Sequence, residues 1–318
     1  MTPLDTPAAR VEGRMRSGVR RLLDSDILHS FLRSKIVVIA GVITVLMVTM
    51  AVLAPVIAPH RPYDLSSVSL LDSNNPPAWI QGGDRRFLLG TDDQGRDLFS
   101  TILYGTRSSI AIGVFSVMLA MAIGVSLGLL AGYLGGRVDT VIMRIADVQL
   151  TFPAILTALL VDGVARIVLG THSMEGGEFW ILVVAIGFSN WVQYARTVRG
   201  TTLVERNKEY VQAARLIGLS RRAIMFRHVL PNVTGPVLVI ATINLALAII
   251  TEATLSFLGV GLPPTQPSLG TLIRIGNNFL FAGEWWIAIF PGITLAVLVL
   301  AVNLLGDWLR DALNPKLR

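Results

Sequence analysis

The sequence predicts an all-α membrane protein with six transmembrane helices and both termini in the cytoplasm. Of its 318 residues, 53% are hydrophobic and only 15% are charged, whereas a soluble domain has about 25% charged residues. Six apolar stretches approach the length of about 20 residues that a helix needs to cross about 30 Å of hydrocarbon. Lys and Arg are distributed unevenly between the segments that connect these stretches, and this bias predicts the orientation.

The six predicted spans follow one another along the chain. They cover residues 36–59, 110–131, 141–162, 179–196, 233–258 and 285–306. The fourth span is short, and the third and fifth contain ionisable residues. The apolar run of the first span is about 24 residues, longer than the 7–15 residues of a signal peptide, so we interpret this span as a retained anchor.

The basic residues predict which segments lie inside. With the N-terminus in the cytoplasm, the inner segments carry 18 Lys and Arg residues and the outer segments carry 7, as the positive-inside rule requires. Residues 1–35 then form a cytoplasmic tail with an amphipathic segment, and residues 307–318 form a second cytoplasmic tail. Residues 60–109 form an extracytoplasmic loop that we expect to fold as a small cap. The net charge of +6 therefore reflects topology, and we expect no binding of nucleic acid.

The sequence lacks the residues that several kinds of chemistry require. There is no Cys, which excludes disulfides and thiolate sites. The three lysines, Lys35, Lys208 and Lys316, do not complete a G-x-x-x-x-G-K-[ST] phosphate loop, so we expect no ATP binding by that route. The four histidines have no metal-ligand spacing. We therefore predict no catalytic residue, no metal site and no cofactor in this chain.

Four glycines recur every fourth residue through and beyond the second predicted span. They are Gly124, Gly128, Gly132 and Gly136. On one helix this spacing places them on a single face, where the backbone of another helix can approach closely. We predict that the glycines serve helix packing; lining of a substrate path by part of this face is the alternative.

Ionisable residues within the spans are expected to face protein or water, because a charge that faces lipid is costly. Arg144 and Asp147 lie three residues apart and are predicted to form a structural pair on one helix face. Glu252 lies deeper and has no partner nearby in the sequence. We consider it a candidate for lining or gating a path through the bundle, with Asn244, two turns earlier, on the same face.

The inner loop, residues 197–232, is predicted to contain two short helices. The first covers residues 209–216 and carries two small residues, Ala213 and Ala214, on its surface. Gly218 is predicted to stop this helix, because glycine readily adopts the left-handed backbone that follows many helices.

Ser220 is predicted to cap the second helix, which carries Arg221 and Arg222, and Pro231 is expected to end that helix before the fifth span. The pair of helices is amphipathic and basic, which is typical of a segment that docks on another surface. Two surfaces fit this pattern: a partner protein in the cytoplasm, or anionic lipid at the membrane surface.

The inner loop resembles the E-A-A-x3-G-x9-I-x-L-P motif of the inner-membrane permease subunits of bacterial ABC importers. The matching residues are Gln212, Ala213, Ala214, Gly218, Leu230 and Pro231. Gln212 replaces the glutamate of the motif, and His228 stands at the isoleucine position. The small pair, the glycine turn and the closing Leu-Pro are all retained.

Other stretches narrow this resemblance to the C-type permeases of dipeptide and oligopeptide importers. Residues 89–97, L-G-T-D-D-Q-G-R-D, with Y-G-T-R at 104–107, are similar to the L-G-T-D-x-x-G-R-D…G-A-R signature of that family. Further similar segments are 131–136, 143–147, 255–261 and 306–317. The resemblance covers about residues 25–318, and nickel and glutathione importers share the signature.

The resemblance implies an ABC type I importer permease fold in the bacterial cytoplasmic membrane, with the core permease domain at 110–306. The chain would form half of a pathway for dipeptides or oligopeptides, beside a homologous second permease. Two ABC ATPase subunits would bind ATP and Mg, and an extracytoplasmic peptide-binding protein would deliver the solute. The residues implied to couple to the ATPases are Gln212, Ala213, Ala214, Gly218, Ser220, Arg221, Arg222, Leu230 and Pro231.

Two alternatives remain open at this point. The same architecture could import nickel, glutathione or another small solute. A secondary transporter is less favoured, because the chain has few ionisable residues in its spans and no visible inverted repeat.

Overall fold

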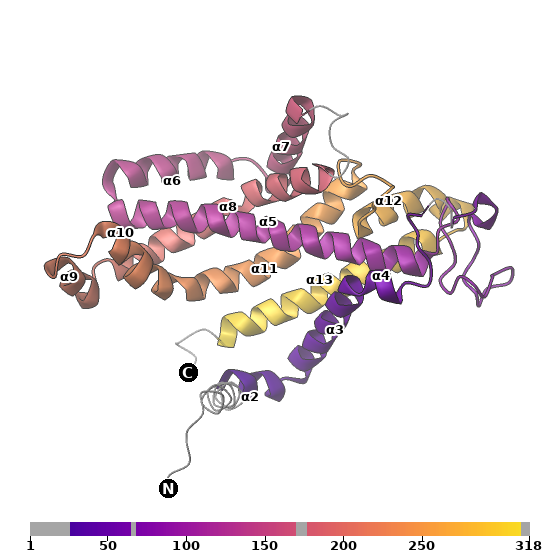
Figure 1. Ribbon diagram of the computed structural model, residues 1–318, viewed down its shortest axis with the longest axis horizontal. Helices are drawn as coiled ribbons and strands as arrows, with labels where there is room; N and C mark the ends of the chain where they lie inside the picture. Colours follow the sequence, from indigo (N-terminus) through magenta and orange to yellow (C-terminus); the bar gives the residue numbers. More distant parts are fainter. Residues whose placement is uncertain (1–25, 65–67, 170–176, 313–318) are drawn as a thin grey trace, which may run out of the picture.

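The computed structural model describes residues 26–64, 68–169 and 177–312. In these parts the chain is helical, and β-structure is limited to an isolated bridge between Thr91 and Asp97. Long helices lie side by side along the long axis of the molecule, and most of the non-helical polypeptide gathers at one end (Figure 1). The predicted all-α fold class is confirmed.

Four long helices form the centre of the bundle. They are α5 (Leu98–Leu134), α8 (Gly177–Glu205), α11 (Leu230–Phe257) and α13 (Trp286–Ala312). Helix α5 packs against both α8 and α11, and α13 packs against α11. The core between these helices consists largely of buried aliphatic side chains, such as Ile112, Ile186 and Ile249.

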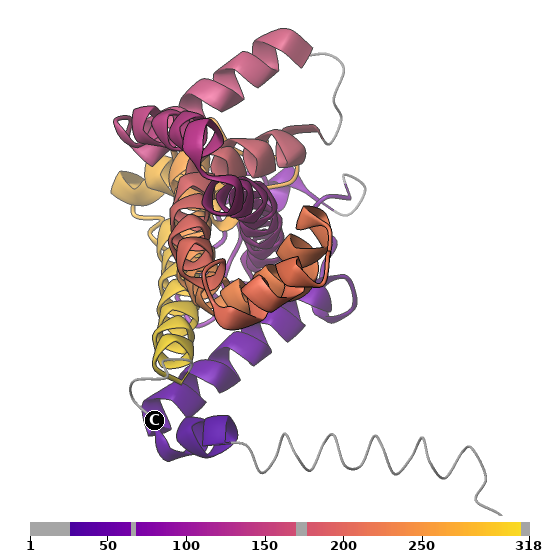
Figure 2. The same cartoon turned by 90° about the vertical axis from the view of Figure 1, so that its left-hand side faces the viewer.

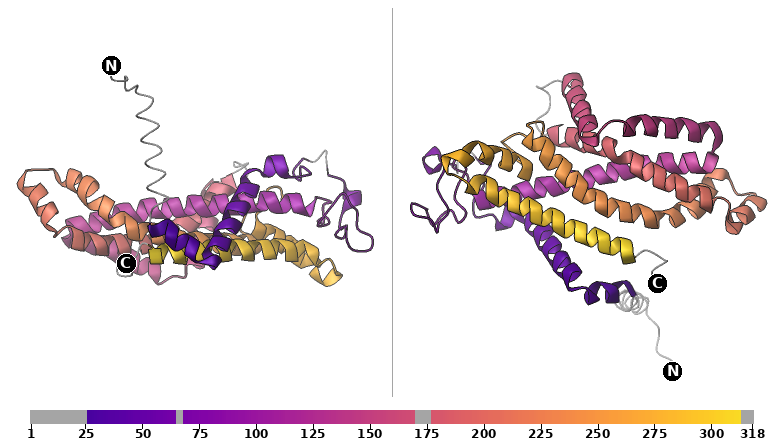
Figure 3. Two further views of the ribbon diagram at one scale, coloured as in Figure 1. Left: turned by 90° about the horizontal axis from the view of Figure 1, so that it is seen from below. Right: turned by 180° about the vertical axis from the view of Figure 1, so that it is seen from behind.

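Three shorter helices precede this centre: α2 (Asp26–Arg33), α3 (Lys35–Val52) and α4 (Ala54–Ile57). Helix α3 lies beside α13, and the ring of Phe31 on α2 meets the ring of Trp308 edge-on at 5.1 Å. The described beginning and end of the chain therefore lie at the same end of the bundle (Figure 3), which is compatible with two cytoplasmic termini. The rest of the predicted N-terminal tail and residues 313–318 lie outside the described residues.

Four of the described helical stretches are long and apolar enough to cross a membrane. They are Lys35–Val52, Leu98–Leu134, Arg221–Phe257 and Trp286–Ala312, and they contain most of the first, second, fifth and sixth predicted spans. The third predicted span corresponds to a bent pair of helices, and the fourth lies within α8, a helix of 29 residues. All six predicted stretches are thus helical over most of their length.

The third predicted span, residues 141–162, is not one straight helix. Helix α6 (Gly136–Leu150) and helix α7 (Ala154–Leu169) meet at a break with a bend of 97°, and α7 diverges visibly from the bundle (Figure 2). Pro153 lies in the break. Proline has no N–H to donate and disfavours helical backbone at the residue before it, so the chain turns there.

Several helices extend beyond the predicted boundaries. Helix α5 begins at Leu98, so the outer loop ends at Asp97, whose side chain accepts a hydrogen bond from Ser100 N at 2.9 Å and caps the helix. Helix α8 continues to Glu205, into the predicted inner loop, and α13 continues to Ala312, into the predicted C-terminal tail.

A further helix, α12 (Leu269–Phe279), and a 3₁₀ turn, η3 (Leu280–Ala282), connect α11 to α13 and were not expected from the sequence. Helix α12 packs closely on its neighbours, because a Cβ on Gly276 would lie 2.4 Å from Ala288 N of α13. A sequence signal was present, because Ser268 Oγ accepts from Thr271 N at 3.3 Å as a helix cap and Leu269, Leu272 and Gly276 form a buried face. With 11 residues the helix is too short to be found as a membrane span.

Candidate functional site

The two ends of the bundle differ in structure, and we name them by the predicted topology. The inner end carries the turn after α8, where helix α9 (Glu209–Leu216) has the predicted bounds. Gly218 has φ = +80°. Leu219 N donates to Ala214 O at 3.1 Å and Gly218 N donates to Arg215 O at 3.0 Å. This pair of bonds closes the end of α9 and needs the left-handed backbone that glycine adopts without cost.

The second short helix begins at Ser220, whose Oγ accepts a hydrogen bond from Ala223 N at 3.3 Å. Helix α10 (Arg221–Ile224) then continues through one π-helical turn, η2 (Met225–Val229), into α11. The expectation that Pro231 ends this helix is wrong. Pro231 directly follows the π-helical turn, in which Leu230 N donates to Met225 O, and the helix continues through it to Phe257.

The exposed surface of α9 differs from the expected one. Ala213 is exposed, but Ala214 is 4% exposed and packs in the core with Val211. The expectation that both alanines lie on the surface is therefore wrong for Ala214. Two large apolar side chains are exposed instead, Leu216 at 88% and Ile217 at 77%. We call Ala213, Leu216 and Ile217 the inner tip.

The inner tip is attached firmly to the bundle. Glu205, at the end of α8, accepts hydrogen bonds from Lys208 Nζ and Tyr210 Oη, both at 2.6 Å. Burial, together with this hydrogen bond, raises the pKa of Tyr210 to about 12. Asn232 Nδ2 of α11 donates to Tyr210 Oη at 3.2 Å, and Gln212 Nε2 donates to Asn207 O at 3.0 Å. The base of α9 is thus bonded to both α8 and α11.

Three of the predicted coupling residues lie away from the inner tip. Arg221 and Arg222 are exposed, and neither side chain has an ion pair or hydrogen bond within the described residues. Together with the half-buried Leu230 they line an apolar cavity of about 500 Å³ between α5 and the α10–η2 segment.

Three of the four regularly spaced glycines pack against α8. An added Cβ on Gly124 or Gly128 would lie 2.4 or 2.5 Å from a backbone oxygen of α8, and one on Gly132 would lie 2.7 Å from Thr202 Cβ. Gly136 differs, because it is the first residue of α6, has φ = +55° and has no atom within 4 Å of an added Cβ. The close approach of two backbones therefore involves the first three glycines.

Glu252 is fully buried where three helices meet. Its Oε2 accepts a hydrogen bond from Ser109 Oγ of α5 and its Oε1 accepts one from Ser256 Oγ of α11, both at 2.7 Å. Ser109 Oγ also accepts from Leu269 N at the start of α12, at 3.2 Å. Asn244 is buried too, and its Nδ2 has no hydrogen-bond partner within the described residues. These contacts support a link between helices, and a pathway role for Glu252 and Asn244 stays a prediction.

The predicted pair between Arg144 and Asp147 does not form. Asp147 instead pairs with Arg196 of α8, and Arg144 is exposed. A second pair lies nearby, in which Arg199 of α8 donates from Nε and Nη2 to Asp139 of α6, both at 2.6 Å. Helix α6 is thus attached to α8 by ion pairs across the helices, which spacing within one helix could not reveal.

One ion pair in the bent third span was missed. Asp162 is fully buried and accepts a hydrogen bond from Arg166 Nε at 2.7 Å, one turn further along α7. Arg166 Nη2 also donates to Val260 O at 3.2 Å, which connects α7 to the loop before α12. The i, i+4 spacing of Asp and Arg was the available signal.

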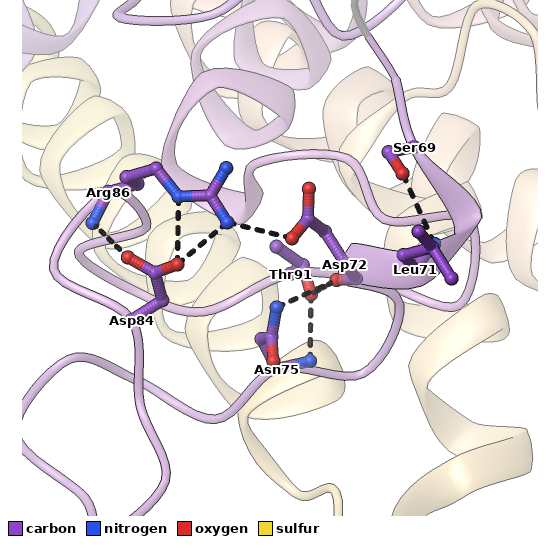
Figure 4. Close-up of polar contacts among 7 residues, drawn as sticks. All are labelled: Ser69, Leu71, Asp72, Asn75, Asp84, Arg86 and Thr91. Carbon is purple, nitrogen blue, oxygen red and sulfur yellow. Dashed lines mark hydrogen bonds and ion pairs between the residues drawn. The ribbon is translucent and has the colours of Figure 1, made fainter.

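The outer end is a compact cap whose polar side chains are paired with one another. Figure 4 shows Arg86 between two carboxylates: Nη2 donates to Asp72 Oδ1 and Nε donates to Asp84 Oδ2, each at 2.8 Å. Thr91 Oγ1 donates to Asp72 O at 2.6 Å and accepts from Asn75 N at 2.8 Å. Ser69 Oγ accepts from Leu71 N at the start of the 3₁₀ turn η1 (Leu70–Asp72). The hydrogen bonds from Arg86 lower the pKa of Asp84.

The signature of residues 89–97 joins this cap to the bundle. Arg96 Nε donates to Asp92 Oδ2 at 2.6 Å, and the two side chains are 3% and 0% exposed. Arg96 Nη1 donates to Pro264 O at 2.7 Å, and Trp286 Nε1 of α13 donates to Thr91 O at 3.2 Å. The signature therefore forms a structural turn that fixes the cap on the loop before α12 and on α13. Within the described residues, no group of three or more His, Asp or Glu side chains could hold a metal ion.

Two family models match the chain. The model described as the inner membrane component of binding-protein-dependent transport systems matches residues 124–318, and the model of the N-terminal transmembrane domain of oligopeptide transport permease C matches residues 25–77.

Individual relatives agree with these matches. The chain is 41% identical to the dipeptide transport system permease protein of Haemophilus influenzae, over 87% of this chain and 90% of the relative. It is 40% identical to a glutathione transport system permease of Pectobacterium atrosepticum (91% and 89% covered) and 36% identical to the oligopeptide transport system permease of Bacillus subtilis (92% and 90%).

Among solved structures, the fold is similar to a chain of the inward-facing MetNI methionine ABC transporter. The TM-score is 0.53 at 19% identity, with 67% of this chain and 96% of that chain covered.

Proposed function

The chain belongs to the family of inner membrane components of binding-protein-dependent transport systems, and from this premise we propose that it forms half of the pathway of an ATP-driven importer of dipeptides and oligopeptides. As a member of this family it is a multi-pass permease subunit of the cytoplasmic membrane. In our proposal the second half of the pathway is a homologous permease, and an extracytoplasmic binding protein delivers the peptide.

The proposed solute rests on the relatives. Permeases named for dipeptides and oligopeptides are 41% and 36% identical to this chain, and the model of the oligopeptide permease N-terminal domain matches residues 25–77. A relative named for glutathione is almost as similar, at 40%, and glutathione is itself a short peptide. Peptide import is therefore favoured, and glutathione import is the second candidate.

The proposed coupling rests on the inner tip. Its apolar side chains, Leu216 and Ile217, are exposed at the end of a helix that is bonded at its base to α8 and α11. Exposed apolar groups on a rigid support favour a protein partner, because their burial stabilises a complex and little ordering of the chain is required. We propose that ATPase subunits, which would bind ATP and Mg, dock on this tip, so that ATP hydrolysis takes place outside this chain.

A substitution at each end tests this docking. Leu216→Asp places a charge on the inner tip and should weaken ATPase association at least about tenfold, as expected for an interface hot spot. Leu71→Asp, on a 96% exposed leucine of the outer cap, is the matched control and should leave association unchanged. The measurement is pull-down of the ATPase from membranes with equal permease levels. Full association of the Leu216→Asp variant would exclude the tip as the docking surface.

Reconstitution tests the solute. The complete transporter with its binding protein, in liposomes, should show ATP hydrolysis stimulated by dipeptides or longer peptides, and peptide accumulation. The permease alone should do neither. Stimulation by glutathione or Ni²⁺ and not by other peptides would show that the proposed solute is wrong. ATP hydrolysis by the purified permease would contradict the proposal that only the ATPase subunits hydrolyse ATP.

A further inference from the structure

Two adjoining cavities lie at the inner end, between the last turns of α5 and the α10–η2 segment. The first, of about 440 Å³, is lined by Tyr133, Leu134, Arg215, Leu219, Arg221 and Ile224. The second is the apolar cavity of about 500 Å³, which also contains Leu134 and Arg221 in its lining. Because they share these two residues, the cavities adjoin, and we call them the polar section and the apolar section of one groove.

The polar section is rich in positive charge. Arg215 and Arg221 line it, and Arg222 lines the adjoining part of the apolar section. The guanidinium of Arg215 lies over the Tyr133 ring at 5.6 Å, whereas Arg221 and Arg222 have no ion pair within the described residues. No Asp or Glu is among the residues that line either section, all of which the structure describes. An anionic group at the junction would therefore lie beside Arg221, with Arg215 lining one section and Arg222 the other, and would meet no opposing carboxylate.

The apolar section has the length of one membrane leaflet. Its α5 wall runs from Val125 to Leu134 and includes Leu129 and Leu130. At 1.5 Å per residue this wall is about 14 Å long, close to half of the hydrocarbon thickness of about 30 Å. Residues 125–131 of this wall belong to the inner end of the second predicted span, at the depth of the cytoplasmic leaflet, and the wall continues past the span to Leu134.

Charge and length together identify the occupant. We propose that the groove binds one acidic phospholipid of the cytoplasmic leaflet, with its phosphate at Arg215, Arg221 and Arg222 and one acyl chain along α5. The cytoplasmic leaflet supplies such lipids, and basic residues at its surface attract them. The bound lipid joins α5 to the segment that carries α10 into α11. This inference does not depend on which solute is transported.

The test uses the assembled transporter in nanodiscs that contain phosphatidylcholine with or without phosphatidylglycerol. Native mass spectrometry counts the phosphatidylglycerol molecules that remain bound. In the groove the two arginines would each bond the lipid phosphate directly, so Arg221→Gln with Arg222→Gln should weaken retention at least about tenfold. The matched control, Arg137→Gln with Arg227→Gln, removes the same charge from two exposed arginines that do not line the groove and should change retention less than about twofold.

A second variant separates the groove from general surface charge. Leu130→Trp fills the apolar section and leaves every arginine in place, and it should also release the lipid. A photoreactive residue at Phe226, which is 61% exposed in the lining, should form adducts with lipid. The proposal is overturned if the control pair loses as much lipid as the Arg221/Arg222 pair, or if Leu130→Trp retains it. Cross-linking of position 226 to the second permease, with no lipid adduct, would overturn it too and identify a protein interface.

Discussion

The outer cap and the inner turn are both irregular segments at the ends of the same helices, but their side chains are used differently. In the cap, three ionisable residues of the signature are buried and bonded within the chain: Asp92 pairs with Arg96, and Asp97 accepts from the backbone of α5. In the inner turn, Leu216 and Ile217 are exposed, and Arg221 and Arg222 have no partner within the described residues. The buried ion pair of the cap is formed within the chain, whereas two arginine side chains of the inner turn are left for a second molecule. Exposed leucines occur at both ends, and they include Leu70 and Leu71 of the cap.

This difference indicates how a family signature should be interpreted. Both motifs identify the family, yet the outer motif, residues 89–97, has a structural explanation inside this chain, and part of the inner motif does not. Substitutions in the outer motif should therefore act through folding, and substitutions at the inner tip should act through association. The predictions below test that separation.

The largest effect is expected at the contact between α5 and α8, because both the outer cap and the inner turn depend on this contact. Gly128→Leu places a Cβ 2.5 Å from a backbone oxygen of α8. No change of side-chain rotamer can remove this overlap, because the atom that is too close belongs to the backbone. We expect loss of the folded complex, measured by size-exclusion chromatography from membranes. Gly292→Leu in α13 is the matched control, because no atom lies within 4 Å of its added Cβ. An assembled Gly128→Leu variant with altered solute choice would instead favour a pathway lining.

The next effect should be confined to the cap. Arg96→Met leaves Asp92 buried without its partner, and such a broken pair costs about 3–5 kcal/mol. We expect faster hydrogen exchange and proteolysis in residues 68–97 of the assembled complex, with ATPase association retained. Arg86→Met is the control, because this arginine is 60% exposed and solvent screens its ion pairs. Equal effects of the two variants would contradict the structural role of the buried pair.

A smaller effect is expected at the inner turn. Gly218→Ala forces a residue with a Cβ into φ = +80°, at a cost of about 1 kcal/mol. Hydrogen exchange of residues 209–224 should increase about fivefold, while exchange in the cap stays unchanged. Gly200→Ala, within helix α8 and with open space around the added Cβ, is the control and should not increase exchange. A change at both ends would mean that the two regions are not independent.

The smallest effect depends on pH at the outer end. Burial raises the pKa of Glu284, and the charge of Asp93 raises it further. A carboxyl group with a raised pKa in the folded state stabilises the fold at acidic pH, and this contribution is lost as the pH rises through the folded pKa. Glu284→Gln should therefore raise the melting temperature slightly at pH 7 and not at pH 4. Equal melting temperatures of the Glu284→Gln variant and the native protein at pH 7 would refute the effect.

Features that depend on neighbours in the sequence could be predicted. The bounds of α9, the left-handed Gly218 and the Ser220 cap all follow from local backbone preferences, and the six apolar stretches follow from the thickness of the membrane. The regular spacing of Gly124, Gly128 and Gly132 can likewise be recognised from the sequence of a single helix.

Features that depend on a second helix could not be predicted. Asp147 has a nearby Arg144 in the sequence, yet its partner is Arg196 of α8, because the packing of α6 on α8 brings these two side chains together. Ala214 was expected on the surface because only the composition of α9 was known, and not which face meets the core. Pro153 was visible in the sequence, but an apolar stretch on both sides of it concealed the bend.

The length of α5 has a mechanical consequence. Its 37 residues form a rod of about 55 Å, which is nearly twice the thickness of the hydrocarbon and runs without interruption from the outer signature to the residues beside the inner turn. A small rotation of so long a helix moves its far end by a large distance. By geometry alone, a rotation of about 10° around its outer end would displace its inner end by about 10 Å. Because α5 and α8 pack backbone against backbone at Gly124 and Gly128, the two helices would have to move together.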